Sequence, residues 1–191
     1  MKPAFKVLLM AFAYLVSFVL GSLTGLIHPM CYAYVGALLP LLFAFIYLYT
    51  STFVRSFGVA TTLNGILLLL LIIAGEADWA LIVGFIILSA LSETIRCRQG
   101  YDTIKGIRLS FLPFAYSFFA YTAHWWTNTQ GSLAAAVEEM PAGYDQLMIP
   151  VIDNIPMLIV ALLITLPVAI LAIRLAERSM WKRGQSPFPH F

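Results

Sequence analysis

The chain has 191 residues, of which 61% are hydrophobic and 10% are charged, and its formal net charge is +2. Its mean hydropathy is +0.91. Soluble domains carry about 25% charged residues, so this composition excludes a soluble enzyme or a soluble binding module. The sequence predicts an all-α integral membrane protein, because a segment that crosses lipid must satisfy its backbone hydrogen bonds within itself.

Six apolar runs are long enough to cross a bilayer, which takes about 20 helical residues. They predict six transmembrane helices in a single domain of residues 1–191, at about residues 7–27, 29–50, 57–75, 79–95, 107–126 and 150–173. The first run is uncharged from Val7 to Ile27 and is therefore longer than the apolar core of a signal peptide. We expect it to be retained as a helix.

The charged residues divide between the two sides of this six-helix arrangement. If the N-terminus is cytoplasmic, all 11 basic residues fall on the cytoplasmic side, as positively charged loops do. They are Lys2, Lys6, Arg55, Arg96, Arg98, Lys105, Arg108, Arg174, Arg178, Lys182 and Arg183. Most carboxylates lie on the outer side, namely Glu76, Asp78, Glu138, Glu139, Asp145 and Asp153. The pattern predicts that both termini are cytoplasmic.

Small residues recur every four positions along the first helix, at Ala13, Ser17, Gly21 and Gly25. Such a stripe lets another helix approach closely, and close approach is a main source of packing energy in a bilayer. The neighbouring helix could belong to this chain or to another protein. Spacing alone favours a helix of the same chain.

Polar residues mark the third helix and the turn that follows it. Asn64, near the middle of the helix, is expected to form an interhelical hydrogen bond or to face a pocket. The turn Gly75-Glu76-Ala77-Asp78-Trp79 places two carboxylates between apolar runs. Asp78 could cap the fourth helix, and we expect Glu76, Asp78 and Trp79 to contact a ligand.

The fifth helix ends on the outer side in an aromatic cluster of Tyr121, His124, Trp125 and Trp126. Aromatic residues gather at any membrane interface, and they also stack on flat or cationic ligands. A long outer loop at residues 127–149 follows. Residues 134–140 within it are expected to form a short helix over the outer surface.

Asp153 and Asn154 lie just inside the outer end of the sixth helix, between Pro150 and Pro156. The prolines remove helical donors, which is tolerated at membrane depth only beside protein or water. We therefore predict a ligand pocket between the outer ends of the fourth, fifth and sixth helices, with Asn64 at its floor. Acidic groups beside aromatic rings favour a cationic or donor-rich ligand.

Motifs that carry chemistry are absent from the sequence. It contains no Gly-x4-Gly-Lys-Ser/Thr phosphate loop, no His-Glu-x-x-His pair and no Gly-x-Ser-x-Gly elbow. One His and one Cys in "IHPMC" fall short of a four-ligand metal site. We expect no enzyme, no metal or other cofactor in this chain, and no nucleic-acid partner. Two alternatives stay open: an accessory or structural membrane protein without a ligand, and an intramembrane enzyme that uses His124 with Asp153 or Glu139.

Three features of residues 27–96 carry a family resemblance. Leu39-Pro40 breaks the second helix, "FGVATTLNGILLLLL" forms the third, and a Gly and then a Trp open the fourth. In these features, and in its layout over about residues 5–180, the chain resembles the Trep-Strep membrane family, MptD-like S components of energy-coupling factor (ECF) transporters.

The resemblance implies the substrate-binding subunit of a vitamin or micronutrient importer in the cytoplasmic (inner) membrane of a prokaryote. Such a subunit binds its ligand outside and docks on a transmembrane scaffold subunit, the T component, with two ATPase subunits that use ATP. The family's docking surface carries over to Ala13 and Ser17, with Gly21 further out, and Ser17 departs from the usual alanine. Cobalt and nickel members begin Met-His, whereas this chain begins Met-Lys, so a metal substrate is not expected.

Overall fold

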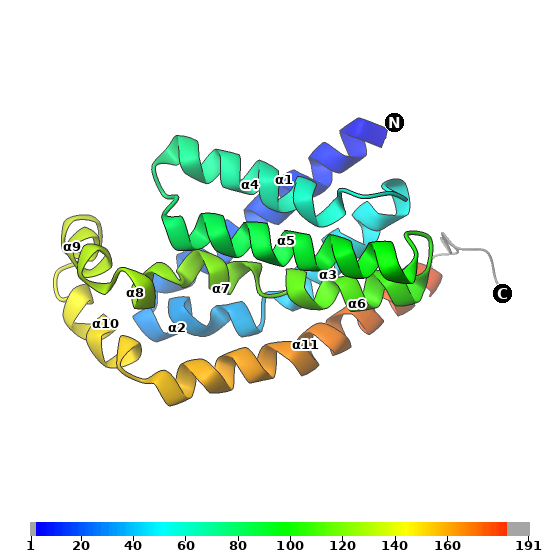
Figure 1. The fold of residues 1–191 in the computed structure, drawn as a ribbon. Coiled ribbons are helices and arrows are strands. Elements are labelled where there is room, and N and C mark those ends of the chain that lie inside the picture. Colours follow the sequence, from blue (N-terminus) through cyan, green and yellow to red (C-terminus); the bar gives the residue numbers. More distant parts are fainter. Residues whose placement is uncertain (1–2, 183–191) are drawn as a thin grey trace.

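The computed structural model describes residues 3–182, and helices account for nearly all of this range (Figure 1). In chain order they are α1 (Pro3–Leu23), η1 (Thr24–Leu26), α2 (Pro29–Tyr34), η2 (Val35–Ala37), α3 (Pro40–Phe53), α4 (Val59–Ala74), α5 (Trp79–Gln99), α6 (Ile104–Phe114), α7 (Ser117–Thr122), α8 (His124–Thr127), α9 (Thr129–Glu139), α10 (Tyr144–Ile152) and α11 (Ile155–Lys182). The elements η1 and η2 are single 3-10 turns. Figure 1 shows α8, α9 and α10 at one end, the cap end, and the start of α1 with the end of α11 at the other, the terminal end.

Three of these helices are long and apolar enough to cross a membrane: Ala4–Leu26, Trp79–Gln99 and Ile155–Met180. A fourth span arises if Pro29–Ala37 and Pro40–Phe53, which meet at a bend of 42°, form one crossing. Helix α4 is apolar but shorter. The described part of the chain is thus all-helical, with three candidate membrane spans, or four with the bent pair.

The prediction of one continuous helix at residues 107–126 is wrong. Helix α6 ends at Phe114, directly after Pro113, and α7 begins only at Ser117. Proline has no backbone N–H, and its ring clashes with the preceding turn, so a helix breaks or bends around it. A further break at Ala123 separates α7 from α8. The chain reaches the cap end in three short helices rather than one.

The outer loop predicted at residues 127–149 is also mostly helical. Helix α9 spans Thr129–Glu139 instead of residues 134–140, and α10 occupies Tyr144–Ile152, most of which was predicted as loop. Helix α10 buries Tyr144 and Met148 one turn apart, so tertiary packing stabilises it. The final helix, predicted at residues 150–173, begins at Ile155.

The core lies where α5 packs on α4, α6 and α7, and where α3 packs on α1 and α11. Tyr14 of α1 is fully buried at its centre, with ring centroids 5.0 Å from Phe18, 4.9 Å from Phe43 and 5.1 Å from Phe114. Aromatic pairs at such distances add about 0.5–1.5 kcal/mol each beyond their buried area. The bundle is therefore held by rings from α1, α3 and α6.

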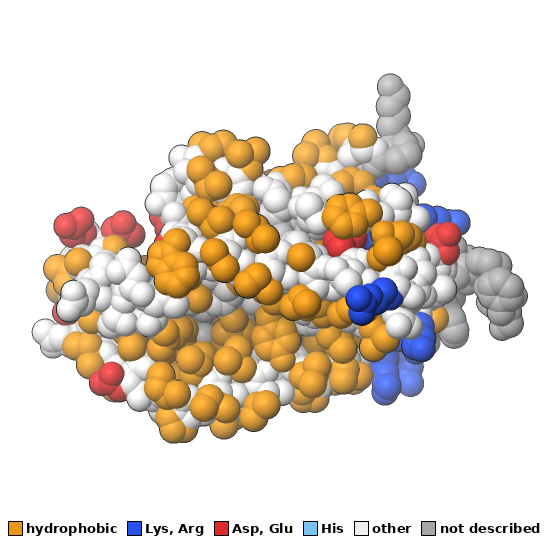
Figure 2. Space-filling model, viewed as in Figure 1, with side chains coloured by type: hydrophobic (Ala, Val, Ile, Leu, Met, Phe, Trp, Pro, Cys, Tyr) orange, Lys and Arg blue, Asp and Glu red, His pale blue; other side chains and the backbone are white. Residues whose placement is uncertain are grey.

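The outer surface of the bundle is apolar between two charged ends. Only 28%, 39% and 22% of the three long spans is buried inside the protein, and Phe12, Ile73, Ile86 and Leu163 are each more than half exposed. On the face in Figure 2, acidic side chains lie at both ends, and the basic side chains gather at the terminal end. Lipid can cover the apolar middle, because bilayers solvate such side chains and water does not.

Candidate functional site

A cavity of about 640 Å³ lies at the cap end. Its walls come from the end of α1, from α2, from the turn between α4 and α5, and from α7, α8 and α9. Five of the residues predicted from the sequence line it, namely Glu76, Asp78, Tyr121, His124 and Trp125. Ligand pockets are typically about 300–1,000 Å³, so this volume suits a small organic molecule.

The turn between α4 and α5 brings its two carboxylates to the cavity. Gly75 ends α4 in the left-handed region, at φ 80°, and the N–H of Glu76 donates to the Leu71 carbonyl at 2.9 Å. This hydrogen bond satisfies an end carbonyl of α4 and reverses the chain. Asp78 then caps α5, where its Oδ1 accepts the N–H of Leu81 at 2.8 Å. Its Oδ2 is buried and has no hydrogen-bond partner among the described residues.

Aromatic rings from α2, α7 and α8 form the wall of the cavity. Trp125 is only 3% exposed, and its ring centroid lies 6.3 Å from that of Tyr32, which lies 6.3 Å from that of Tyr121. The indole N–H of Trp125 makes no hydrogen bond within residues 3–182. The wall therefore offers apolar ring surface together with one unused donor.

His124 opens α8, beyond the end of the apolar helices, and is bonded to α9. Its Nδ1 lies 2.8 Å from Ser132 Oγ, and the Ser132 hydroxyl donates to the His124 carbonyl at 3.0 Å. Because the Ser132 hydroxyl proton is used in the bond to the carbonyl, the Nδ1–H of His124 must be the donor to Ser132 Oγ. His124 therefore does not act as a base that would make Ser132 a nucleophile. Burial lowers the pKa of His124 below its ordinary value of 6.5, and the nearby carboxylate of Asp78 offsets part of this effect.

Four other predicted site residues lie near the cap end but do not line the cavity. Trp79, the first residue of α5, is 61% exposed and does not line the cavity. Trp126 donates its indole N–H to the Ile152 carbonyl at 3.2 Å and so fastens α8 to α10. Asp153 is exposed beside Asn154, whose Oδ1 accepts the N–H of Met157 at 3.1 Å at the start of α11.

Asn64 joins three helices at the centre of the bundle and does not line the cavity. Its Oδ1 accepts the hydroxyl of Tyr14 at 2.8 Å, and its Nδ2 donates to Ser89 Oγ at 3.0 Å. The side chain is 1% exposed. Of the two roles predicted for Asn64, the structure has the interhelical hydrogen bond.

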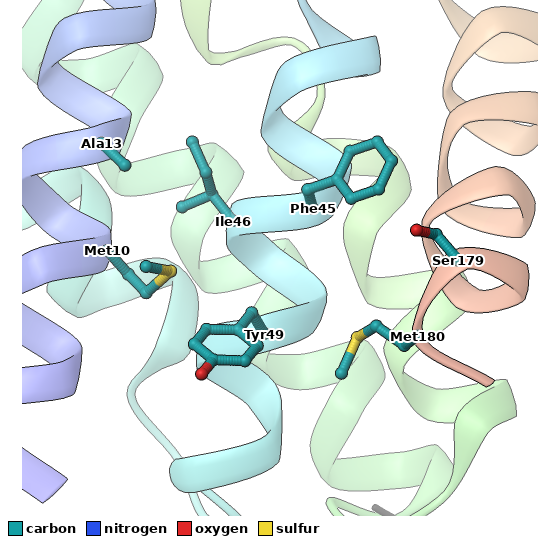
Figure 3. Close-up of a pocket in the computed structure, with 7 residues that line it drawn as sticks. All are labelled: Met10, Ala13, Phe45, Ile46, Tyr49, Ser179 and Met180. Carbon is teal, nitrogen blue, oxygen red and sulfur yellow. The ribbon is translucent and has the colours of Figure 1, made fainter. Parts of the chain in front are cut away.

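Most of the small-residue stripe on α1 faces the interior of this chain. A Cβ on Gly21 would lie 2.6 Å from the ring of Phe118, and Ser17 is buried with its hydroxyl bonded to the Ala13 carbonyl at 2.9 Å. Ala13 lies further toward the terminal end. It lines a smaller groove of about 290 Å³ between α1, α3 and α11, where Figure 3 shows Met10 and Ala13 opposite Ile46 and Tyr49. Of the stripe, only Ala13 borders a space that another molecule could enter.

The sequence interpretation missed several residues that line the cavity, among them Phe18, Tyr32 and Ser132, and it considered Glu139 only for an enzyme. Phe18 could have been found from helical spacing. It follows Tyr14 by four residues on one face of α1, and both are buried. Ser132 carried no such signal, because its place depends on the fold of α9 over α8.

Several charged residues at the terminal end also hold helices together, although the sequence interpretation used them only to assign the cytoplasmic side. Glu93 and Arg96, one turn apart on α5, are 1% and 0% exposed. Glu93 accepts the N–H groups of Gly58 and Ala60 at the start of α4, at 3.0 and 2.8 Å. Arg96 donates to the Val54 carbonyl, at the end of α3, at 2.7 Å. The two side chains therefore stabilise the turn between α3 and α4.

A second pair of charged residues joins α6 to α11 at the same end. Arg108 donates to both carboxylate oxygens of Glu177, with its Nη2 lying 2.8 Å from Oε1 and its Nε 2.9 Å from Oε2. Glu177 is 6% exposed. A bidentate pair of this kind fixes the angle between its helices as well as their contact.

Comparison with curated proteins and with solved structures finds no match to this chain. Comparison with protein families matches residues 2–183 to a family described as hypothetical bacterial integral membrane protein (Trep_Strep). The match covers nearly the whole chain and agrees with the long apolar helices. The chain therefore belongs to the Trep_Strep family of bacterial integral membrane proteins.

Proposed function

We propose that this protein is the substrate-specific binding subunit of an ECF-type importer for a vitamin-like micronutrient. It captures the ligand in the cap-end cavity on the outer side of the cytoplasmic membrane. It then docks on a transmembrane scaffold subunit, and two partner ATPase subunits hydrolyse ATP, while this chain catalyses no reaction. The observation that carries the proposal is the cavity of about 640 Å³, lined by rings and carboxylates, at one end of an apolar bundle.

The unused polar atoms of the cavity support a ligand role. Oδ2 of Asp78 and the indole N–H of Trp125 are buried without partners in the described chain. An unsatisfied buried polar group costs about 1–3 kcal/mol, and a bound polar molecule would remove that cost. Both groups belong to residues that line the cavity, which favours a ligand there over an accessory protein that binds nothing.

The proposed topology has six crossings. They are α1 with η1, the bent pair α2 and α3, α4, α5, the pair α6 and α7, and α11. An even number of crossings returns the chain to its starting side, in keeping with the start of α1 and the end of α11 at one end in Figure 1. The basic residues at that end favour the cytoplasmic side for it.

Native mass spectrometry of the protein, purified in mild detergent from its own host, tests ligand capture. We expect a bound small molecule on the wild type and its loss from Trp125→Phe, which keeps a ring but removes the N–H donor. The matched control is Trp79→Phe, since Trp79 is exposed at the same end and does not line the cavity. A wild-type protein without any small molecule would favour the accessory alternative.

Docking is tested by co-purification of the scaffold and ATPase subunits from the same membranes. Ala13→Leu fills part of the groove between α1, α3 and α11. We expect it to reduce recovery of the partners and to leave the bound small molecule in place. If Ala13→Leu removed the small molecule as well, the stripe would serve internal packing along its whole length.

A further inference from the structure

The cap-end cavity is electrostatically one-sided. Its lining includes the carboxylates of Glu76, Asp78 and Glu139, and no Lys or Arg is among the described residues that line it. His124 is the one group there that could become a cation by taking up a proton. The basic residues seen in Figure 2 gather at the terminal end, and the length of α5 separates them from the cavity. Every formal charge among the described lining residues is negative, so each would attract a positively charged ligand.

The two oxygens of Asp78 have different surroundings. Oδ1 is occupied by the first turn of α5, where it accepts the N–H of Leu81. Oδ2 is buried and accepts no hydrogen bond within residues 3–182. A carboxylate oxygen in that position is best satisfied by a donor that also carries positive charge, because charge-assisted hydrogen bonds are roughly twice as strong as neutral ones. The position of Asp78 is also held by its capping bond, so the oxygen is fixed before a ligand arrives.

The aromatic wall of the cavity adds a second, independent requirement. Trp125 is 3% exposed, and its N–H donor is unpaired, so the ligand should carry an acceptor or present the face of a π system. The rings of Tyr121 and Trp125 each stand nearly perpendicular to the ring of Tyr32, at 89° and 83° between planes. Aromatic rings of this kind attract cations as well as apolar groups.

Resting on the proposed function, we propose that the transported micronutrient is a small organic cation with at least one N–H donor, and that Asp78 Oδ2 is its anchor. Glu76 and Glu139 add attraction at the rim, where both are exposed. The tyrosine and tryptophan rings enclose the apolar body of the ligand. A phosphorylated or carboxylated nutrient would be repelled by the same three carboxylates.

A series of three probes with one shape and different charge tests this inference. Benzamidinium, benzamide and benzoate share a phenyl ring and a planar substituent, and they are positive, neutral and negative. Their binding to the protein, emptied of any co-purified molecule, can be followed by titration calorimetry in mild detergent. We expect benzamidinium to bind at least tenfold more tightly than benzamide, which is about 1.4 kcal/mol, and benzoate to be the weakest.

Asp78→Asn identifies the anchor, because asparagine caps a helix as well as aspartate does but carries no charge. We expect the preference for benzamidinium over benzamide to fall about tenfold in this variant. Glu138→Gln is the matched control, since Glu138 adjoins Glu139 but does not line the cavity, and the preference should be unchanged there. Equal affinities for the three probes, no binding by any of them, or an unchanged preference in Asp78→Asn would overturn the inference.

The inference and the proposed function fail in different ways. If native mass spectrometry identified a neutral or anionic molecule in the cavity, the cation inference would be wrong while the role in substrate capture would stand. If the purified protein bound benzamidinium through Asp78 but carried no natural ligand and recovered no ATPase subunits, the cation site would stand without the importer.

Discussion

Glu93 takes the place of a capping side chain at the start of α4, and its replacement by glutamine should weaken the fold measurably. Oε1 accepts the N–H of Ala60 at 2.8 Å and Oε2 that of Gly58 at 3.0 Å. Glutamine keeps one acceptor but turns an NH2 group toward the other N–H. The loss of one hydrogen bond to a charged group is worth about 1.5–3 kcal/mol, and the loss of the carboxylate at a helix N-terminus adds about 0.3–2 kcal/mol. We expect Glu93→Gln to lower the free energy of unfolding by about 2–5 kcal/mol.

Unfolding by sodium dodecyl sulfate in mixed micelles, followed by helical circular dichroism, measures this change. The matched control is Asp102→Asn, an exposed carboxylate at the same end whose Oδ1 lies 3.9 Å from Arg55 Nε. Exposed ion pairs contribute only about 0–1 kcal/mol, so the control should unfold nearly as the wild type does. If Glu93→Gln and Asp102→Asn proved equally stable, the capping role assigned to Glu93 would be refuted.

Three further changes test the packing and the pH response. Gly21→Ala should lower the melting temperature, because the added Cβ would lie 2.6 Å from the buried ring of Phe118. The control Gly65→Ala should be neutral or stabilising, since nothing lies within 4 Å of a Cβ at that position. Equal melting temperatures for the two variants would argue against an interior stripe. Tyr14→Phe should cost about 1–3 kcal/mol of stability by leaving the Asn64 oxygen unpaired, yet calorimetry should show unchanged benzamidinium affinity, and a large loss of affinity would place Asn64 in the binding site after all. Because burial lowers the pKa of His124 in the folded state, the unfolded state binds more protons, so melting temperatures should fall as the pH drops below 6.5; His124→Gln should flatten this slope, and an identical slope would contradict the buried neutral form.

Hydropathy predicted where the helices of this protein lie but not where they break. The apolar runs located α1, α4 and α5 to within about four residues at each end, because lipid exposure demands a continuous hydrophobic surface. They located α11 as well, but this helix continues to Lys182, beyond the predicted end at residue 173. Pro113 was visible in the sequence, and a helix is expected to break or bend there. The helix α10 was missed because its signal is short, although Tyr144, Met148 and Ile152 recur every four residues.

The acidic and aromatic character of the cap end was predictable, and the choice among its residues was not. Glu76, Asp78 and Trp125 reach the cavity through the turn before α5 and the start of α8. Trp79 and Trp126 have the same chemistry but point elsewhere, since neighbours along a helix differ by about 100° in direction. Which of two adjacent tryptophans faces a cavity depends on the rotation of the helix, and packing decides that rotation.

Helix α5 has no break along its length. It contains no proline and runs 21 residues from Trp79 to Gln99, which at 1.5 Å per residue is about 30 Å. Its first turn is held by Asp78 at the cavity, and Glu93 and Arg96 near its last turn hold the ends of two other helices. In contrast, the segments α2–α3 and α6–α8 are each broken into shorter helices. A ligand that binds Asp78 and displaces it would therefore move α5 as one rigid helix. That movement would be transmitted to the turn between α3 and α4.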